Sequence, residues 1–368
     1  PTSIDLGFGI FELNLSLSSP EGASLAELKS ARHHWWPENV SAFWKDEEGF
    51  TNWLMPDGSV KRMPPKNLGV IGNGHQIRLG QAGEATPFDQ DFEGVFDRAD
   101  NNFPGVIQWL QGLERDDAPS SEPLAARFRP LEVPDDNLAK LAEGLISLAV
   151  RSPMNRESAV SVAEHHRGPL PGAERNALIG LNMRDTHQEA VKQIGIRGKF
   201  VAIYSPNKEF IFGDGFYHNI RSPLNAMHSP TLLALLTPNI AALFVRPMSY
   251  RTLPRFFTLA IDADEAERLN HAIQVHARKQ IFYRTDRPKI ADVYRRERHL
   301  VYTGANPVKD LIENIPGVER PRQRFFLSTD LSVPSALGPT DRVSQKKREL
   351  GFWLGTMVPL LRKCFLIN

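Results

Sequence analysis

The densest group of chemically capable side chains is Arg32-His33-His34-Trp35-Trp36-Pro37, in which two histidines precede two tryptophans and a proline. Imidazole titrates near neutral pH and binds metals, whereas indoles offer large flat surfaces. Pro37 disfavours helical geometry at the residue before it, and it is expected to close a short helix that a capping box at Ser24–Glu27 starts and that leads towards His33. If the histidine segment is extended, successive side chains point to opposite sides, so His33 and His34 need not serve one site. A histidine hydrogen-bonded beneath an indole is the competing interpretation.

Two carboxylates elsewhere could join a histidine. Glu93 is the central member of an acidic stripe that helical spacing predicts over residues 87–101, made of Asp89, Glu93, Asp97 and Asp100. Asp214 follows the apolar run at 210–212, where a rigid strand would hold it in an accessible turn. Solvent or an arginine facing the stripe, and a plain Asp-Gly turn, are the alternatives. We expect catalytic roles for His33, His34, Glu93 and Asp214, with His34 and Glu93 as the metal ligands.

Two further polar residues lie where apolar neighbours predict burial. Arg151 ends a helix whose apolar face holds leucines, so its guanidinium should need an anionic partner. Asn270 shares a helix face with Ala266, Ile273 and Ala277, where a lone amide must find buried partners. Each residue is expected either to bind substrate or to act as a structural tie.

Composition limits the class of protein. The 368 residues contain one cysteine, Cys364, so intrachain disulfides and cysteine-based zinc sites are ruled out, and a cytoplasmic location is expected. The longest apolar run, 231–245, contains Pro238 and is shorter than the roughly 20 residues that a membrane helix needs, so no membrane association is expected.

The charge is distributed unevenly along the chain. Residues 1–140 hold 12 Lys and Arg against 22 Asp and Glu, whereas the remainder holds 32 against 21. Either the two parts pack together and neutralise each other, or the basic part presents a face to nucleic acid. The basic clusters available for such a face are Arg284/Arg287/Lys289, Arg295/Arg296/Arg298 and Lys346/Lys347/Arg348.

The pattern of elements predicts an α+β chain that is predominantly α-helical, with small β-hairpin and sheet elements packed near the N-terminal and central segments. Strands are expected at 4–17 and 240–245, and hairpins at 50–63 and 199–212. Helices are expected at 87–101, with Pro104 starting a second short one, and at 135–151, 154–166, 174–193, 262–284, 308–314 and 343–366. An acidic β-rich part with one helix (1–115), a linker or loop (116–134) and a basic, mainly helical part (135–368) are expected to pack as one large domain.

Several well-known motifs do not occur: the phosphate loop, the dinucleotide-binding glycine pattern, the Gly-x-Ser-x-Gly elbow and His-Glu-x-x-His. Their lack argues against an ordinary kinase, dehydrogenase or serine hydrolase.

In its order of short motifs, the chain resembles a bacterial family known as domain of unknown function 4238. The resemblance spans about residues 30–285 and is carried by His33–Pro37, Phe92-Glu93, Arg151-Ser152-Pro153, the strand at 210–215, Leu236-Thr237-Pro238 and Leu269-Asn270. Trp35-Trp36 replaces the family's Tyr-Val, and residues 213–216 lack its serine and proline. The resemblance brings no established activity and implies that these widely spaced polar residues converge.

The mixture of imidazole, carboxylates and arginine with a basic C-terminal part favours a hydrolase of nuclease or phosphodiesterase type acting on nucleic acid. A divalent metal is the candidate cofactor, and phage defence or a toxin system is a setting that such an enzyme would suit. The alternative is a non-enzymatic binding or regulatory protein in which the same polar residues form a structural network. The sequence leaves the substrate and the oligomeric state open.

Overall fold

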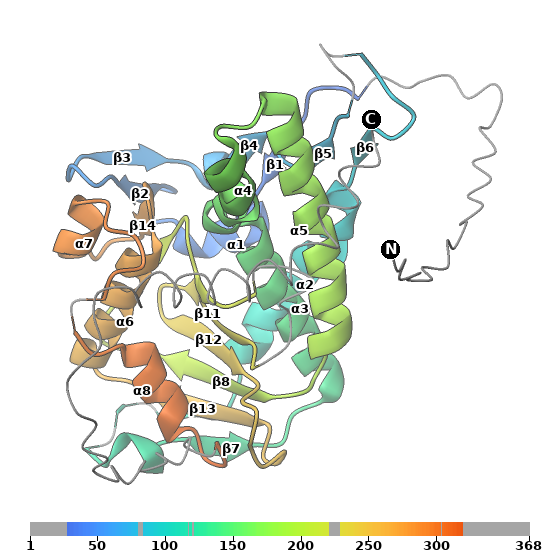
Figure 1. Ribbon diagram of the computed structural model, residues 1–368. Helices are drawn as coiled ribbons and strands as arrows, with labels where there is room; N and C mark the ends of the chain where they lie inside the picture. Colours follow the sequence, from blue (N-terminus) through green and yellow to red (C-terminus); the bar gives the residue numbers. More distant parts are fainter. Residues whose placement is uncertain are drawn as a thin grey trace, which may run out of the picture.

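A six-stranded sheet forms the centre of the protein, as the computed structural model shows (Figure 1). The structure describes residues 28–318, apart from 80–83, 117, 120, 221–228 and 303. In spatial order the strands are β10 (Tyr217–His218), β11 (Thr231–Thr237), β12 (Ile240–Val245), β8 (Lys199–Tyr204), β13 (Phe256–Ala260) and β7 (Arg129–Leu131). Neighbouring strands run antiparallel, except for β8 and β13, which run parallel.

The central strands β8, β11, β12 and β13 are buried along almost their whole length. Their sequences are accordingly continuous apolar runs and do not alternate apolar with polar residues, as expected for strands covered on both faces. The sheet corrects the expected fold class. Helices make up 41% and strands 20% of the described residues, so the fold is mixed α/β and not predominantly helical.

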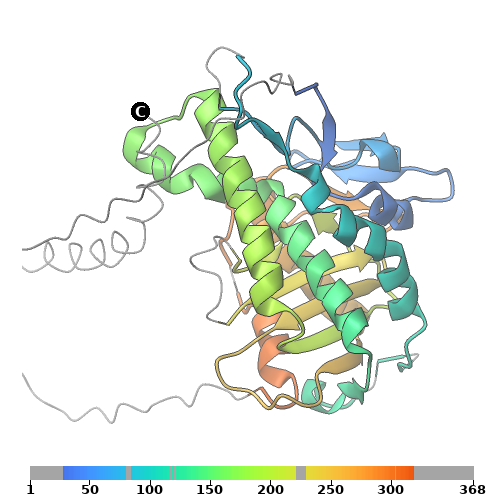
Figure 2. The same ribbon diagram turned by 90° about the vertical axis from the view of Figure 1, so that its right-hand side faces the viewer.

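Three long helices lie side by side in front of this sheet in Figure 2: α2 (Asp97–Gln111), α3 (Asp135–Arg151) and α5 (Gly172–Ile194). α4 (Pro153–Arg167) packs against α3 and α5, whereas α6 (Ala263–His276) packs against α8 (Pro307–Asn314). The short helical elements are α1 (Glu38–Ser41), α7 (Asp292–Arg295), η1 (Ala42–Trp44), η2 (Pro65–Asn67), η4 (Glu93–Val95) and η5 (Leu124–Ala126).

Three smaller sheets are formed mainly by strands from the first third of the described chain. An antiparallel four-stranded sheet has the order β3 (Val60–Met63), β2 (Thr51–Leu54), β14 (Ile281–Tyr283) and β9 (Phe212–Gly213). Two two-stranded antiparallel sheets pair β1 (Arg32–His34) with β4 (Val70–Gly72) and β5 (Gln76–Ile77) with β6 (Gln90–Asp91). These two sheets carry the candidate site.

The indoles anchor the His-His-Trp-Trp-Pro segment in the core. Trp35 and Trp36 are almost completely buried, and the Trp36 ring stacks on Phe212 with ring centroids 4.1 Å apart. The chain passes close beside this indole at Gly69, whose φ is +65° and where an added Cβ would meet the Trp36 backbone. A side chain at Gly69 would therefore push the anchor away.

The expected helix over 87–101 is wrong. Residues 90–91 form β6, residues 93–95 form η4, and α2 begins at Asp97 and continues through Pro104. Asp89 and Glu93 therefore precede the helix, so the four acidic residues form no helical stripe. A proline inside a helix cannot donate to the carbonyl four residues earlier, which here belongs to Asp100. The side-chain amide of Asn39 donates to that carbonyl instead.

Two other expectations about elements are also wrong. The predicted hairpin of 199–204 with 209–212 does not form, because β8 pairs with β12 and β13 while β9 pairs with β14. The predicted helix over 262–284 ends at His276, and β14 follows. The Asp214 carboxylate accepts the backbone N–H groups of Arg278 and Lys279 and so holds the chain in its non-helical path.

The remaining elements agree more closely with expectation. The hairpin at 50–63 is confirmed as β2 and β3, and the helices near 135–151, 154–166, 174–193 and 308–314 are confirmed with small shifts of their ends. Residues 129–131 of the expected linker form β7, an edge strand of the large sheet. The expected strand at 4–17, the capping box at 24–27, the helix at 343–366, Lys346/Lys347/Arg348 and Cys364 lie outside the described residues.

The amide of Asn39 gives a test of how the proline is accommodated. Asn39→Ala should lower the free energy of unfolding by about 1–3 kcal/mol, because the Asp100 carbonyl loses its hydrogen-bond donor. Urea unfolding of the variant measures this loss. As a control, the free energy of unfolding of Asn101→Ala, at an exposed position of α2, should stay within about 0.5 kcal/mol of the wild type. Equal stability of the two variants would show that the amide does not support α2.

Candidate functional site

His33 and His34 are directed to opposite sides of β1. His33 is 4% exposed and lies opposite Ile71 of β4, whereas the His34 ring lies with Nε2 3.3 Å from the carbonyl oxygen of Lys66. This divergence follows from the alternation of side chains along a strand. It separates the two histidines that were expected to be catalytic: only His33 faces the cluster described next.

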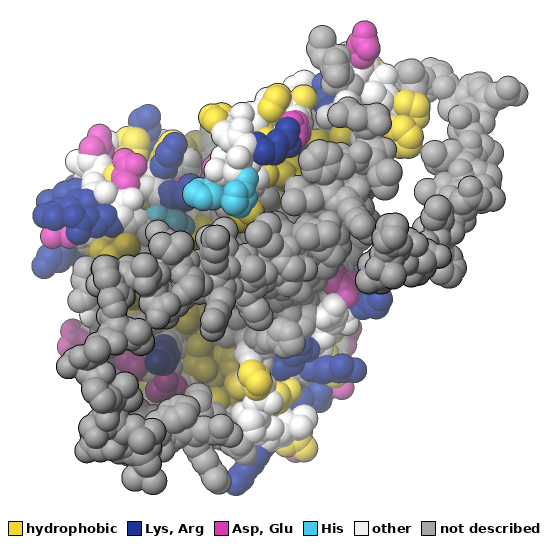
Figure 3. Space-filling view, in the orientation of Figure 1, with side chains coloured by type: hydrophobic (Ala, Val, Ile, Leu, Met, Phe, Trp, Pro, Cys, Tyr) yellow, Lys and Arg dark blue, Asp and Glu magenta, His cyan; other side chains and the backbone are white. Residues whose placement is uncertain are grey.

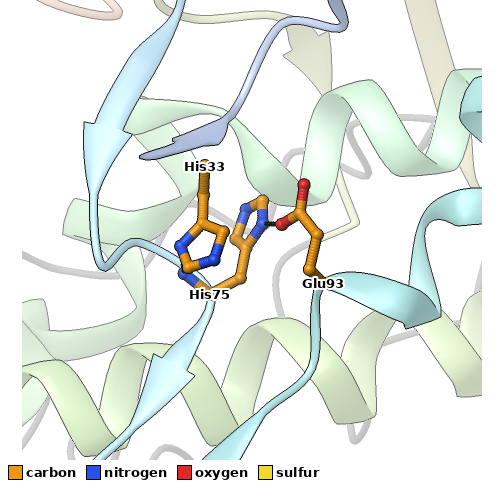
Figure 4. Close-up of side chains that lie close together, drawn as sticks. All are labelled: His33, His75 and Glu93. Atoms are coloured by element: carbon orange, nitrogen blue, oxygen red, sulfur yellow. Dashed lines mark hydrogen bonds and ion pairs between the residues drawn. The ribbon is translucent and has the colours of Figure 1, made fainter. Parts of the chain in front are cut away.

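A second histidine completes that cluster. After β4 the chain turns through Asn73, which has a φ of +52°, and Gly74, and then places His75 beside His33. The pairing of Gln76 with Asp91 then brings Glu93 next to His75, and the backbone N–H of Phe92 donates to the His75 carbonyl over 3.0 Å. In Figure 4 the Glu93 carboxylate contacts Nδ1 of His75.

His33, His75 and Glu93 could hold a metal ion. They offer ligand atoms that all lie within 4.8 Å of one another. Three segments that are separate in the sequence supply them: β1, the turn before β5, and η4. Nitrogen and oxygen donors of this kind suit divalent transition metals, and carboxylates also suit Mg²⁺.

A backbone hydrogen bond fixes the proton on His33. The N–H of His75 donates to Nδ1 of His33 over 3.0 Å, and the two rings are stacked with centroids 5.0 Å apart. Nδ1 therefore carries no proton, so the proton of the neutral ring is on Nε2, which lies 3.3 Å from Asp91 Oδ2. A ring held in this tautomer accepts one hydrogen bond at Nδ1 and can donate one at Nε2. Nδ1 of His75 and the carboxylate of Glu93 are the better metal ligands.

Burial shifts the pKa values of both His75 and Glu93. It lowers the pKa of His75 well below its usual value, and the positive charge of Arg151 adds to the effect. Burial also raises the pKa of Glu93, against the opposing influence of Arg151. Both shifts oppose the ion pair that the contact between His75 and Glu93 alone would suggest. His75 is therefore a neutral imidazole at pH 7, as metal binding requires.

Asp91 stays ionised beside this pair. Burial acts to raise its pKa, but hydrogen bonds from the Glu93 backbone and the Gln76 side chain outweigh burial, and the pKa is lowered. The site thus combines the ionised Asp91, the imidazole of His33 and the contact between His75 and Glu93, which can support acid–base chemistry or metal binding.

Arg151 lies behind the site. Its side chain is fully buried, and its two terminal nitrogens donate to the two oxygens of Asp100 over 2.9 and 2.5 Å. It also donates to the His34 carbonyl over 3.3 Å and lies over the Phe96 ring, 4.7 Å from its centroid. A guanidinium engaged in this way has no surface for a substrate. We therefore assign Arg151 the role of positioning β1 and α2.

Asp214 and Asn270 hold the backbone together elsewhere. The two carboxylate oxygens of Asp214 accept backbone N–H groups over 2.7 and 3.0 Å. The Asn270 side chain accepts from the N–H of Ile211 over 3.1 Å and donates to the Glu209 carbonyl over 2.9 Å. Neither residue belongs to the His33–His75–Glu93 group, and these bonds give both of them structural roles.

Sequence reasoning did not select His75 or Asp91. The signal for His75 was Gly72-Asn73-Gly74, a bend that turns the next side chain inward, but a bend does not show what that side chain meets. The site also lies apart from a cavity of about 480 Å³, which is lined by residues such as Phe43, Arg115, Tyr204 and Asn239. Since this cavity contains none of the clustered groups, we base the site on the side-chain chemistry.

Comparison of the chain with protein-family models, curated proteins and solved structures finds no match in any of the three. Of the helices in the described ranges, none has the length and apolar character needed to cross a membrane. The functional argument therefore depends on the geometry of the site.

His187 gives the region a pH-dependent stability. It is buried on α5 against Phe96, and neither ring nitrogen has a hydrogen-bond partner within the described parts of the chain. Burial, with Arg151 and Arg98, lowers its pKa from 6.5 to about 3. Below pH 6.5 His187 is protonated in the unfolded chain but stays neutral in the folded chain. The free energy of unfolding therefore falls as the pH falls towards 3.

Replacing His187 should flatten this dependence. Between pH 6.5 and pH 5 the residue should account for about 2 kcal/mol of lost stability, and His187→Leu should remove that part of the slope. Urea unfolding at several pH values measures it, with His165→Leu, at an exposed position of α4, as the control. Identical slopes for the wild type and His187→Leu would contradict a depressed pKa.

Proposed function

We propose that the protein is a hydrolase of nuclease or phosphodiesterase type that uses a divalent metal ion at His75 and Glu93. The observation that carries the proposal is the convergence of His33, His75 and Glu93, whose ligand atoms lie within 4.8 Å of one another. His33 and His75 are buried, and Glu93 is partly exposed.

The donor set suits an ion that keeps part of its water shell. Mg²⁺ and similar ions are commonly held by one or two protein ligands, with water and substrate phosphate oxygens completing the coordination. An ion held by His75 and Glu93 would lower the pKa of a bound water and so would supply the nucleophile for hydrolysis of a phosphate ester. His33, whose two ring nitrogens are engaged by the His75 backbone N–H and by Asp91, would hold the site in shape without transferring a proton.

Nucleic acid is the proposed substrate because of the exposed cluster Arg295, Arg296 and Arg298 at α7, in the region where Figure 3 shows Lys and Arg side chains gathered. Cations of this kind bind phosphate backbones in a salt-dependent manner. The resemblance to the family known as domain of unknown function 4238 stays part of the proposal, but it brings no established activity and indicates no substrate.

A non-enzymatic binding or regulatory role is the second candidate. It is favoured by the internal hydrogen bonds of Arg151, Asp214 and Asn270, which behave as a structural network. In that case the His75–Glu93 pair would also be part of the scaffold. Removing one member of it would then cost several kcal/mol of stability.

Cleavage assays separate the two candidates. Purified protein should cleave single- or double-stranded DNA or RNA, or bis(p-nitrophenyl) phosphate, with added Mg²⁺, Mn²⁺ or Zn²⁺ and not in EDTA. Glu93→Gln should lower kcat by about 100-fold or more, because the ion loses its charged ligand. His165→Gln, at an exposed position distant in sequence from the site, should keep wild-type kinetics.

The hydrolase is contradicted if no metal supports cleavage of any of these substrates, or if Glu93→Gln cleaves as fast as the wild type. A large fall in the melting temperature of Glu93→Gln, without cleavage by the wild type, would instead favour the structural network.

A further inference from the structure

Arg156 lies beside the candidate site, and its side chain makes a single hydrogen bond to the described part of the chain. It belongs to the first turns of α4, and its Nη1 donates to the carbonyl oxygen of Gly74 over 2.7 Å. Gly74 immediately precedes His75, so this bond fixes the guanidinium next to the site. The same positive charge lowers the pKa of His75, which agrees with their proximity.

The two acidic residues that follow Arg156 on α4 are both paired with Arg175. Its distance is 2.7 Å to Glu157 and 2.9 Å to Glu164. Within the described ranges no carboxylate comes within ion-pair distance of Arg156. The Arg156 side chain is partly exposed, so an anion from solution can reach its unpaired charge and compensate it.

The rest of the guanidinium is open to a ligand. A guanidinium offers five N–H donors, and the bond to Gly74 uses one of them. None of its nitrogens is among the buried atoms that lack a partner, so the free donors reach solvent. Burial and the charge of Arg175 lower its pKa to about 10, which leaves Arg156 fully charged at neutral pH. An anion bound there would lie next to His75.

We propose that Arg156 binds a non-bridging phosphate oxygen of the substrate, which makes the substrate of this site a phosphate ester. The inference rests on the proposed hydrolase and adds the residue that recognises the anion. Arg151 cannot bind the substrate phosphate, because both of its terminal nitrogens donate to Asp100. The planar fork of an arginine matches two phosphate oxygens, whereas a lysine offers a single point of charge.

Inorganic phosphate is a probe for this contact that needs neither turnover nor metal. Titration calorimetry in EDTA should show phosphate binding to the wild type with a Kd on the order of 1 mM. Arg156→Met should weaken binding by about 10-fold or more, and Arg156→Lys by a smaller factor of about 3 to 5. Arg184→Met is the matched control, because Arg184 lies beside Gln90 but is already paired with Asp185. It should bind phosphate as the wild type does.

The inference is overturned if the wild type does not bind phosphate, or if a folded Arg156→Met binds it as tightly as the wild type. Circular dichroism checks the folding. If Arg156→Met does not fold, Arg156→Lys decides, and unchanged affinity in that variant overturns the inference.

The two proposals can fail separately. If phosphate binding depends on Arg156 but no metal supports cleavage, the hydrolase proposal is contradicted and the anion site at Arg156 stands. Cleavage with an unchanged KM in Arg156→Met would remove the anion site and leave the hydrolase.

Discussion

The buried guanidinium of Arg151 is the constraint on which the arrangement of the site depends. A fully buried charge is tolerated only when hydrogen bonds and an opposite charge compensate for it, and Asp100 supplies both through two parallel bonds. The same group donates to the His34 carbonyl and covers the face of Phe96. One side chain at the end of α3 thereby fixes β1 and the beginning of α2 relative to each other.

The site is built around this contact. Phe96 lies between Arg151, His75 and His187, with ring centroids 5.0 Å from His75 and 4.9 Å from His187. On the other side, Trp35 and Trp36 bind the His33 segment to the aromatic core. His33 and His75 are therefore held by packing as well as by hydrogen bonds, and the tautomer of His33 is fixed before any ligand arrives. Such preorganisation is what metal binding and acid–base chemistry need.

Several features of the site and its surroundings could be predicted from local sequence patterns, because the burial of one side chain depends on its neighbours in the sequence. The indoles as anchors, the need of Arg151 for an anionic partner and the structural role open to Asn270 all follow from burial of a polar or flat side chain. The parts that could not be predicted depend on distant pairing. The apolar runs of β8, β11, β12 and β13 do not reveal that they form one sheet, so the sequence predicts a mainly helical chain. Glu93 reaches His75 only through the pairing of Gln76 with Asp91.

The central claim is that His75 and Glu93 hold a divalent ion, and a metal-soaked crystal tests it most directly. Crystals of the protein soaked in Mn²⁺ should show an anomalous difference peak within coordination distance, about 2.0 to 2.3 Å, of His75 Nδ1 and the Glu93 carboxylate. The peak should disappear in Glu93→Gln, and Nε2 of His33 should remain outside the coordination shell. A map without a peak there, or an unchanged peak in the variant, would contradict the account.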